Sequence, residues 1–368
     1  MEYVQERVTT LHDLADPVPD APTDRAAVVV PMTERDHASL AAERVFATLE
    51  GLDPGRVVVA LRADPERVGE VAAWLDGYDL AGEVLWCDGP RVEAALREAG
   101  LDGPRGKGRD VWLALGAATA PDDGEEFAVV HDADAKRYSE RHVRRLLFPL
   151  ARGHDFAKGY YARVEDGRLY GRLFRLFYRP LVRALAERRG APVVDYLAAF
   201  RYALAGEFAA TSGLARRLRL PRGWGLEVGT LGDAFAHAGF EGTAQVDLGV
   251  HEHDHRAVAG PRGLGDMSEE VGAALFRALA DHGVDPDYDG LAEAYRAAGR
   301  RLVDQYATDA AFNGLEYDPE GEREQVEAYA GAVGPPGDDD RLPAWRDAPL
   351  AAGDLRAAAR ADLAEVGP

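Results

Sequence analysis

A short acidic motif could bind a divalent cation. The segment 126–135 reads EFAVVHDADA, so Asp132 and Asp134 follow a run of apolar residues. Side chains two residues apart on an extended segment point to the same side, and two carboxylates placed in this way can hold a hard cation through oxygen ligands. Because an aspartate after a strand also commonly caps a helix, a purely structural role is the alternative.

Three histidines alternate with other residues in the sequence HEHDH at 251–255. Alternating histidines at the end of a strand are a candidate metal site, and a catalytic zinc site with three histidines is one option. Three alternate residues on a strand span too far for one small ion, so a single histidine that joins Asp134 is the easier arrangement. An exposed polar edge is the alternative for each of them.

Lysine is nearly absent, and its three copies are Lys107, Lys136 and Lys158, whereas the other basic residues are all arginine. A compact ammonium on a flexible stem suits tasks that arginine performs poorly. Lys107 lies in the glycine-rich loop GPRGKGRD (103–110), where free backbone N–H groups and a helix N-terminus suit phosphate binding. The loop departs from the Walker A pattern, and an ordinary surface loop is the alternative.

One glutamate is a candidate for a buried functional carboxylate. Glu227 lies between glycines and apolar residues in GWGLEVGTLGDAF (223–235). Buried carboxylates are usually paired or functional, so this setting favours a role in a site, with a hydrogen-bonded structural glutamate as the alternative.

A row of arginines is a candidate anion pocket. Arg168, Arg172, Arg175 and Arg179 are spaced by three or four residues within 167–190, which predicts one side of an amphipathic helix. A solvated helix face is the alternative.

Composition excludes several classes of partner. The formal net charge is −21, which disfavours binding to nucleic acid or to an anionic membrane. Acidic residues spread along the whole chain are typical of a protein that stays soluble in high salt, although an ordinary acidic cytosolic protein has a similar composition. The single Cys87 excludes an internal disulfide. With no long apolar run and no signal-peptide pattern, we expect a soluble, cytoplasmic protein.

The first 150 residues alternate between apolar runs and amphipathic stretches, which predicts a doubly wound, mostly parallel sheet. Ligands bind beyond the carboxyl ends of the strands in such sheets, and the acidic motif lies at one of these ends. The expected strands are 26–32, 56–63, 83–89 and 126–135, and the expected helices are 37–49, 65–75, a segment ending at 96, and 110–118.

Later residues are organised differently. A mixture of strand and turn is expected at 196–211, a strand at 244–255, helices over 267–329, a linker at 334–343 and a peripheral Ala-rich helix at the end. We therefore predict a nucleotide-binding half at 1–150, an acceptor-binding half at 151–265 and a C-terminal helical extension at 266–368.

Eight segments, taken together and in order, resemble the glucosyl-3-phosphoglycerate synthases and the related mannosyl-3-phosphoglycerate synthases of the retaining GT-A class. They are VVVPMTE, GKGRDVW, VVHDAD, FAKGYY, GRLFRLFYRPL, AGEFAAT, GWGLEVGTLGD and AQVDLGVHEHDH, and they cover about 26–275. The resemblance implies a GT-A fold, a nucleotide-diphosphate hexose such as UDP-glucose as donor, Mg²⁺ or Mn²⁺ as cofactor, and a homodimer.

The resemblance also implies roles for individual residues. Pro31 and Glu34 match the loop that holds the nucleotide base, Lys107 and Asp132 lie near the nucleotide, Asp134 and His253 match the metal ligands, and Glu227 matches the glutamate beside the donor sugar. Gly171 and Arg172 match the pair that grips the phosphate of the acceptor. Asp134 and Glu227 are thus the residues expected to carry catalysis.

The sequence departs from the family pattern at the acceptor segment. Phe174 replaces the family's threonine, so a hydroxyl that would bind phosphate is missing, and Arg175 and Lys158 are candidates to compensate. His251 replaces an arginine two residues before the metal histidine.

The resemblance implies that a hexose is transferred to 3-phosphoglycerate with retention of configuration, in the synthesis of a glucosylglycerate or mannosylglycerate solute. One alternative is a GT-A transferase with another anionic acceptor or with a polyprenyl phosphate. The lack of a membrane segment or basic amphipathic helix argues against the lipid. The motifs are also compatible with a nucleotide-sugar-binding protein without catalysis or with a metal-dependent hydrolase of nucleotide sugars.

Overall fold

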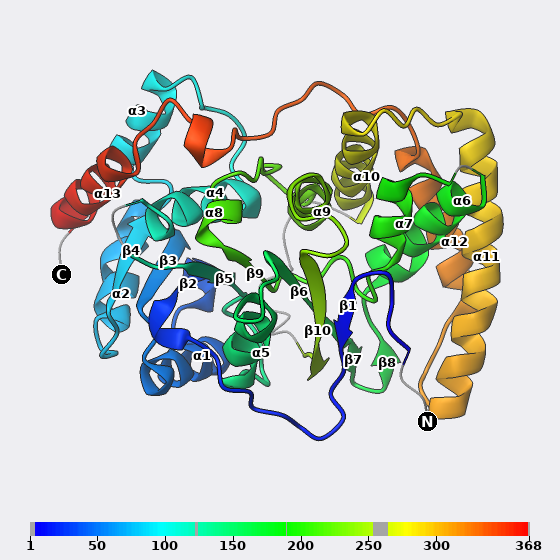
Figure 1. Cartoon of the computed structure of the whole chain (residues 1–368), viewed down its shortest axis with the longest axis horizontal. Helices are drawn as coiled ribbons and strands as arrows, with labels where there is room; N and C mark the ends of the chain where they lie inside the picture. Colours follow the sequence, from blue (N-terminus) through cyan, green and yellow to red (C-terminus); the bar gives the residue numbers. More distant parts are fainter. Residues whose placement is uncertain (1–3, 122–123, 189, 253–263, 367–368) are drawn as a thin grey trace.

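The structure is a computed structural model that describes residues 4–121, 124–188, 190–252 and 264–366. Its centre is an eight-stranded sheet with the order β1-β10-β6-β9-β5-β2-β3-β4 (Figure 1). Neighbouring strands are parallel except where β9 pairs with β5 and β6. The strands are Thr9–Leu11 (β1), Ala26–Thr33 (β2), Arg56–Arg62 (β3), Gly82–Trp86 (β4), Phe127–Val130 (β5), Phe156–Ala162 (β6), Phe208–Thr211 (β9) and Thr243–Val250 (β10), and a separate hairpin joins Val164–Glu165 (β7) to Arg168–Leu169 (β8).

Helices lie on both faces of the sheet and extend beyond it. The α-helices are Leu40–Leu52 (α1), Pro65–Leu75 (α2), Pro90–Glu98 (α3), Lys107–Ala118 (α4), Arg141–Leu150 (α5), Arg179–Arg188 (α6), Pro192–Ala198 (α7), Ser212–Ala215 (α8), Leu226–His237 (α9), Leu264–Asp281 (α10), Tyr288–Asn313 (α11), Pro319–Tyr329 (α12) and Ala352–Val366 (α13). Shorter turns are Thr23–Arg25 (η1), Glu34–Asp36 (η2), Ala330–Ala332 (η5) and Trp345–Asp347 (η6), and Leu173–Tyr178 (η3) is π-helical.

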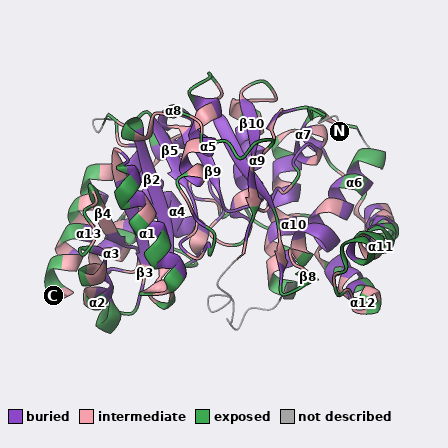
Figure 2. Ribbon diagram, turned by 90° about the horizontal axis from the view of Figure 1, so that it is seen from below, coloured by how far each residue is buried: buried purple, intermediate pink, exposed green. Residues whose placement is uncertain are grey.

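The alternation of side chains along β2 shows how the sheet acquires two buried faces. Ala26, Val28 and Val30 pack toward α1, α2 and α5, whereas Ala27 and Val29 pack toward α3, α4, α7 and α9. This period of two is what an extended strand imposes. In Figure 2 the buried strands lie between helices whose exposed sides face outward. The carboxyl ends of the parallel strands are then where polar side chains from several elements can meet.

The predicted alternation of strands and helices in the first half is confirmed, with shifts at the element ends. The helix expected at 65–75 is α2, which has Pro65 in its first turn and Asp64 before it. The strand expected at 126–135 is shorter, because β5 ends at Val130, where its pairing with β9 also ends. The acidic motif therefore follows the strand instead of lying within it.

The single helix predicted over 167–190 is wrong. The segment begins in the β8 strand, turns at Gly171, continues as the π-helical η3 and only then becomes α6. Gly171 has a φ of +76°, a conformation that a residue with a side chain adopts at a cost, so the chain changes direction there. The arginine spacing of this segment consequently does not produce one helix face.

The last residues return to the first half of the chain. Helices α11 and α12 pack beside α6 and η3, but α13 packs on α3 (Figure 1). The buried Asp362 of α13 accepts hydrogen bonds from the backbone N–H groups of Arg91 and Val92 in the first turn of α3, at 3.0 and 3.1 Å. The final helix is thus docked on the nucleotide-binding half that we predicted from the sequence.

No described helix combines the length and the apolar character that crossing a membrane requires.

Candidate functional site

Three charged side chains meet beyond the carboxyl end of β5. The Lys107 ammonium lies 2.7 and 2.8 Å from the two carboxylate oxygens of Asp132 and 3.6 Å from Oε1 of Glu227. These residues come from the first turn of α4, the turn after β5 and the first turn of α9. The structure thus brings together three side chains that the sequence predicted for one site, and we name them the charged cluster.

Glycines allow the first turn of α4 to approach another backbone segment closely. A Cβ added at Gly106 would lie 2.4 Å from the carbonyl oxygen of Arg222, and one added at Gly108 would lie 1.8 Å from that of Pro221. The backbone N–H of Arg109 donates to the Arg222 carbonyl at 3.1 Å. The glycine-rich loop is therefore closely packed on 221–222, and its binding of a phosphate stays a prediction.

The electrostatics of the cluster keep Lys107 charged. Burial by itself disfavours the ammonium, but the carboxylates of Asp132 and Glu227 outweigh this effect and raise the pKa of Lys107. The side chain of Glu227 is only 12% exposed, and burial raises its pKa while Lys107 and Lys158 oppose the rise. The cluster therefore presents a fixed positive charge next to a largely buried carboxyl group.

Lys158 lies beneath the cluster. It is fully buried on β6, and its ammonium donates to the carbonyl oxygen of Ala205. Burial lowers the pKa of Lys158 to about 8, although Glu227 and Glu207 favour the charged form. This position does not match the predicted contact with an acceptor, because the ammonium supports the 205–207 turn from inside the protein.

Two residues of that turn belong to the site and were not singled out from the sequence. A Cβ added at Gly206 would lie 2.7 Å from Oδ2 of Asp132 and 2.9 Å from Nζ of Lys107, so a larger residue there would displace this pair. Glu207 is buried, and its charge acts on both Lys107 and Lys158. The motif AGEFAAT could have indicated Glu207, because a glutamate buried in an apolar run is usually paired or functional.

The charge balance at the cluster fits a bound divalent cation. Burial raises the pKa of Asp36, and the carboxylates of Asp134 and Asp132 add to the rise. Among the residues that the structure describes, the interacting carboxyl groups around the cluster outnumber the ammonium groups: Asp36, Asp132, Asp134, Glu207 and Glu227 against Lys107 and Lys158. A cation with oxygen ligands would offset part of this excess negative charge.

The second predicted metal ligand, His253, lies outside the described residues, as does His255. Among the residues that the structure does describe, no group of three ligating side chains is assembled. His251 is buried, and its ring stacks on Tyr161 with centroids 4.2 Å apart. The N–H of Lys136 donates to the carbonyl of Glu252 at 2.9 Å, so the end of this segment lies beside the acidic turn.

The residues expected to hold the nucleotide base lie at the end of β2. Pro31 is buried and pairs with Ala60 of β3. Glu34 lies in η2, and its carboxylate accepts a hydrogen bond from the N–H of Asp64 at 2.8 Å. Both residues are thus near the carboxyl ends of β2 and β3, as predicted for a nucleotide, and their contact with one stays a prediction.

Aromatic side chains connect the predicted acceptor segment to β6. The Phe174 ring contacts Tyr202 at a centroid distance of 4.8 Å, and Tyr202 contacts Tyr161 at 5.0 Å. Tyr202 also lies against Gly171, where an added Cβ would be 3.1 Å from its hydroxyl. Arg172 is exposed at the start of η3. Phe174 therefore fills an aromatic layer below the segment and replaces the missing threonine with packing instead of a hydrogen bond.

The predicted arginine row is divided among different partners. Arg175 forms a two-pronged ion pair with Glu322 of α12 at 2.6 and 2.8 Å, and Arg168 pairs with Glu316. Arg179 donates to the carbonyl of Ala198 at 3.0 Å. The predicted compensation by Arg175 is not supported, since its guanidinium is buried between η3 and α12, where it joins these two elements.

Buried histidines support the turn that carries Asp132 and Asp134. Nε2 of His131 lies 2.7 Å from the hydroxyl of Tyr138, and the Tyr138 ring stacks on His142 at 4.7 Å. Burial lowers the pKa of His131 to about 3 and that of His142 to about 4. Both rings are therefore neutral in the folded protein at neutral pH.

Acidification should destabilise the fold through His142. The pKa of His142 is about 4 in the folded protein and 6.5 in the unfolded chain. Between these two pH values the unfolded chain binds more protons than the folded protein, so stability is lost as the pH falls below 6.5. From pH 7 to pH 5 we expect His142 to lower the free energy of unfolding by about 2 kcal/mol. Urea unfolding at both pH values, on the wild type and on His142→Phe, measures this. An equal decline in the free energy of unfolding of the wild type and of His142→Phe would contradict this prediction.

Comparison with known proteins identifies relatives of this chain. No protein-family model matches the chain. A glucosyl-3-phosphoglycerate synthase from Methanococcoides burtonii is 34% identical over 390 residues, which cover 97% of this chain and 96% of the relative. Another glucosyl-3-phosphoglycerate synthase, from Persephonella marina, is 36% identical over 294 residues, which cover 76% of this chain and 72% of the relative.

Solved structures share the fold. The glucosyl-3-phosphoglycerate synthase from Mycobacterium tuberculosis in complex with Mn²⁺, UDP-glucose and phosphoglyceric acid superposes with a TM-score of 0.56 at 25% identity, over 76% of this chain and 89% of that chain. The mannosyl-3-phosphoglycerate synthase from Rubrobacter xylanophilus gives a TM-score of 0.54 at 24% identity, over 71% of this chain and 76% of that chain. The predicted GT-A-type fold is confirmed, and with a relative that matches nearly the whole chain, this protein belongs to the glucosyl-3-phosphoglycerate synthase family.

Proposed function

We propose that this protein transfers glucose from UDP-glucose to 3-phosphoglycerate with retention of configuration at the anomeric carbon. The observation that carries the proposal is the contact of Lys107 with both Asp132 and Glu227 at the strand ends of a GT-A-type sheet. Membership of the glucosyl-3-phosphoglycerate synthase family supports the transferred glucose and the acceptor, and the solved structure with UDP-glucose and phosphoglyceric acid supports the donor.

The charged cluster is suited to stabilising a departing nucleoside diphosphate. Sugar transfer breaks the bond between the anomeric carbon and a phosphate oxygen, so negative charge develops on the leaving group. Lys107 stays protonated beside it and offers a cation whose position Asp132 already fixes. A charge that is oriented before the reaction stabilises the transition state without reorganisation. Glu227 is proposed to accept hydrogen bonds from hydroxyls of the donor sugar.

We propose that Mg²⁺ or Mn²⁺, which prefers oxygen ligands, would be held by the carboxylate of Asp134, with Asp132 nearer the nucleotide. When bound there it supplies further charge stabilisation for the diphosphate. A solved family member contains Mn²⁺ together with UDP-glucose. The role of His253 as a further ligand stays a prediction.

The acceptor has one free hydroxyl, on the carbon next to its carboxylate, and this hydroxyl would attack the anomeric carbon on the face that the diphosphate leaves. Gly171 and Arg172 are proposed to hold the acceptor's phosphate, with the positive φ of Gly171 setting the turn and the exposed Arg172 supplying charge. Phe174 adds no polar group here, since its ring is buried against Tyr202.

The experiment is an acceptor-dependent transfer assay in high salt with Mg²⁺ or Mn²⁺, scored by product mass. UDP-glucose, GDP-glucose and GDP-mannose are each paired with 3-phosphoglycerate, and a phosphorylated glucosylglycerate formed from UDP-glucose is the expected product. Release of free glucose at the same rate without an acceptor would instead indicate a hydrolase. Donor binding with no product and no release would indicate a binding protein.

The buried Phe174 favours a second candidate, in which the same transferase uses another anionic acceptor. Glycerol 3-phosphate and D-glycerate, tested in the same assay, separate the need for the carboxylate from the need for the phosphate. Activity on D-glycerate above that on 3-phosphoglycerate would show that the phosphate site was lost together with the threonine.

The remaining expectations concern the setting of the enzyme. The net charge of −21 supports adaptation to high salt, and the assay's salt dependence measures it. The homodimer, the cytoplasmic location and the role in making a compatible solute stay predictions from the family resemblance.

A further inference from the structure

We propose that residues 339–345, which we name the C-terminal brace, hold Lys107 and Glu227 at the spacing that sugar transfer requires, with Arg341 as the positioning residue. This inference rests on the function proposed above. The brace is distant from the charged cluster in sequence, and it runs from the α10 side of the molecule past α9 and α4 toward α13 (Figure 1). Three sets of contacts support the assignment.

The first set joins the brace to α4, the helix that begins at Lys107. Trp345 stacks on Trp112 with centroids 4.1 Å apart and planes at 20°. The Trp345 indole N–H donates to the carbonyl of Trp112 at 2.6 Å, and the Trp112 indole N–H donates to the carbonyl of Pro343 at 2.7 Å. A Cβ added at Gly116 would lie 2.0 Å from the Trp345 ring. The brace thus packs tightly along the side of α4.

The second set joins the brace to the loop between α8 and α9. Leu342 and Leu220 exchange backbone hydrogen bonds of 2.9 and 3.2 Å, and both side chains are fully buried. The Arg222 guanidinium donates to the carbonyls of Asp340 at 3.0 Å and Leu101 at 3.1 Å. Because the Arg222 carbonyl also accepts from Arg109 of α4, this loop lies between the brace and the helix that carries Lys107.

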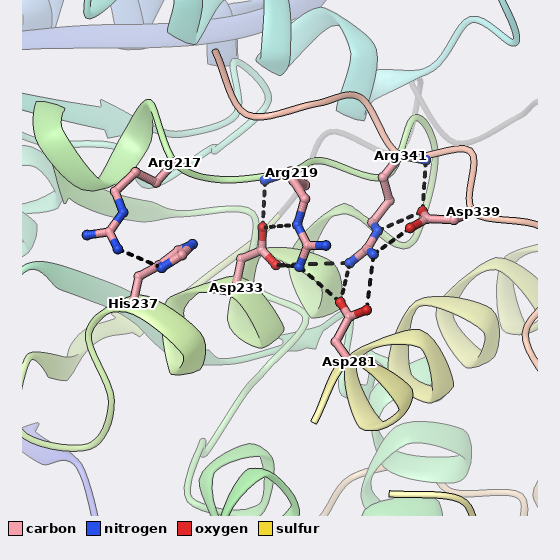
Figure 3. Close-up of polar contacts among 7 residues, drawn as sticks. All are labelled: Arg217, Arg219, Asp233, His237, Asp281, Asp339 and Arg341. Carbon is pink, nitrogen blue, oxygen red and sulfur yellow. Dashed lines mark hydrogen bonds and ion pairs between the residues drawn. The ribbon is translucent and has the colours of Figure 1, made fainter. Parts of the chain in front are cut away.

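The third set is an ion-pair network around Arg341, whose side chain is 8% exposed (Figure 3). Its guanidinium contacts Asp281 of α10 at 2.7 Å and Asp339 of the brace at 2.6 Å. Arg219 contacts Asp281 at 3.0 Å and pairs with Asp233 of α9 at 2.6 Å. Asp233 also accepts from the backbone N–H of Arg219 at 2.6 Å.

Within this network the two arginines share Asp281, so neither can be removed without affecting the other. Asp233 is nearly two turns after Glu227 on α9, and it is buried. Removing Arg341 would leave Arg219 as the cation that these contacts supply to both Asp281 and the buried Asp233, and a buried carboxylate that loses part of its compensation is costly. The expected response is a shift of α9 and the loop before it, which changes where Glu227 points.

The brace therefore contacts the flanks of the two helices whose first turns form the charged cluster. The Lys107 ammonium lies 3.6 Å from Oε1 of Glu227, and the place of each side chain depends on the position of its helix. A displacement of about 1 Å at a reacting centre can cost about 10²-fold in rate. The brace is thus placed to influence catalysis, although it contributes no side chain to the cluster.

The experiment compares Arg341→Met with a neighbouring control, Arg346→Met. Arg346 lies just outside the brace, and its exposed side chain pairs with Asp347 at the surface. Both proteins and the wild type are assayed at least 15 °C below the lower melting temperature, with rates expressed per folded enzyme by circular dichroism. For Arg341→Met we expect a kcat about 10- to 100-fold lower and an unchanged KM for 3-phosphoglycerate, because the acceptor segment lies elsewhere. The control should keep the wild-type kcat.

Arg341→Lys is the second variant, and it protects the test if Arg341→Met does not fold. A lysine keeps the positive charge but lacks the planar fork whose separate N–H groups reach Asp281 and Asp339, so its kcat should lie between those of the wild type and Arg341→Met. A wild-type kcat in a folded Arg341→Met, a loss of the same size in Arg346→Met, or a rise in acceptor KM with unchanged kcat would each overturn the proposal.

The dissociation constant of UDP-glucose with Mn²⁺, measured by calorimetry on the same proteins, separates this proposal from the proposed function. A wild type that binds UDP-glucose but transfers glucose to no acceptor would contradict the function alone. The brace would then be judged by binding: weaker binding of UDP-glucose by Arg341→Met than by Arg346→Met supports it, and equal binding overturns it.

Discussion

Replacing Lys107 with methionine is expected to lower kcat/KM for glucosyl transfer by about 10²- to 10³-fold, the usual cost of removing one oriented group that stabilises developing charge. Methionine keeps most of the side-chain volume but removes the ammonium that lies between Asp132 and Glu227. The loss has two origins: the leaving diphosphate loses a fixed cation, and two carboxylates are left facing each other.

A second consequence of Lys107→Met concerns Glu227. The lysine opposes the rise in the pKa of Glu227 that burial causes, so its removal should raise this pKa further. The acidic limb of the kcat/KM profile should therefore move to higher pH. Lys136→Met is the matched control, because this lysine is exposed and should retain wild-type kinetics. A pH profile of Lys107→Met that matches the wild type at reduced rate would show that Glu227 does not depend on the lysine.

Replacing Asp134 with asparagine should reduce transfer by at least about 10³-fold, because metal assistance contributes several kcal/mol to stabilising the charge that develops on the leaving group. The substitution keeps the size of the side chain and removes one negative charge from the acidic turn. Asparagine is a weak ligand for a hard divalent cation compared with a carboxylate. Titrating Mn²⁺ into the assay should not restore the rate at concentrations that saturate the wild type.

Metal binding can be measured without activity. A ligand present at 100 times its dissociation constant stabilises the folded protein by about 2.7 kcal/mol, so Mn²⁺ with UDP should raise the melting temperature of the wild type and not that of Asp134→Asn. Asp53→Asn is the control, since Asp53 is exposed with a φ of +51°, which asparagine also tolerates. An equal thermal shift in Asp134→Asn and the wild type would exclude Asp134 as a ligand.

The first half of the fold could be predicted from the sequence because its signals are local. The apolar run at 26–32 and the proline at the start of α2 depend on residues within one turn or strand. The same holds for part of the site: Lys107, Asp132 and Glu227 each lie at the start of a helix or just after a strand, and the topology of a parallel sheet brings such positions to one edge. The family resemblance then named these residues together.

The class of fold and the members of the charged cluster thus follow from local pattern and family resemblance, whereas packing between distant segments sets which polar side chains a ligand can reach. The sequence suggested that Arg175 binds the acceptor, but in the structure it pairs with Glu322, which is 147 positions away. Lys158 was suggested for the same role, but its ammonium is buried on the carbonyl of Ala205. The glycines at the start of α4 suggested a phosphate-binding loop, and packing shows that Gly106 and Gly108 also accommodate 221–222.

The proposed contribution of the C-terminal brace could not be predicted from local pattern either, because Arg341 contacts Asp281 of α10 and lies 4.0 Å from Asp233 of α9, and both are distant from it in the sequence. The physical reason is the same in each case. A charge is neutralised by whichever opposite charge or carbonyl the packed chain places within about 3 Å, and that partner is set by packing between distant segments instead of by neighbours in the sequence.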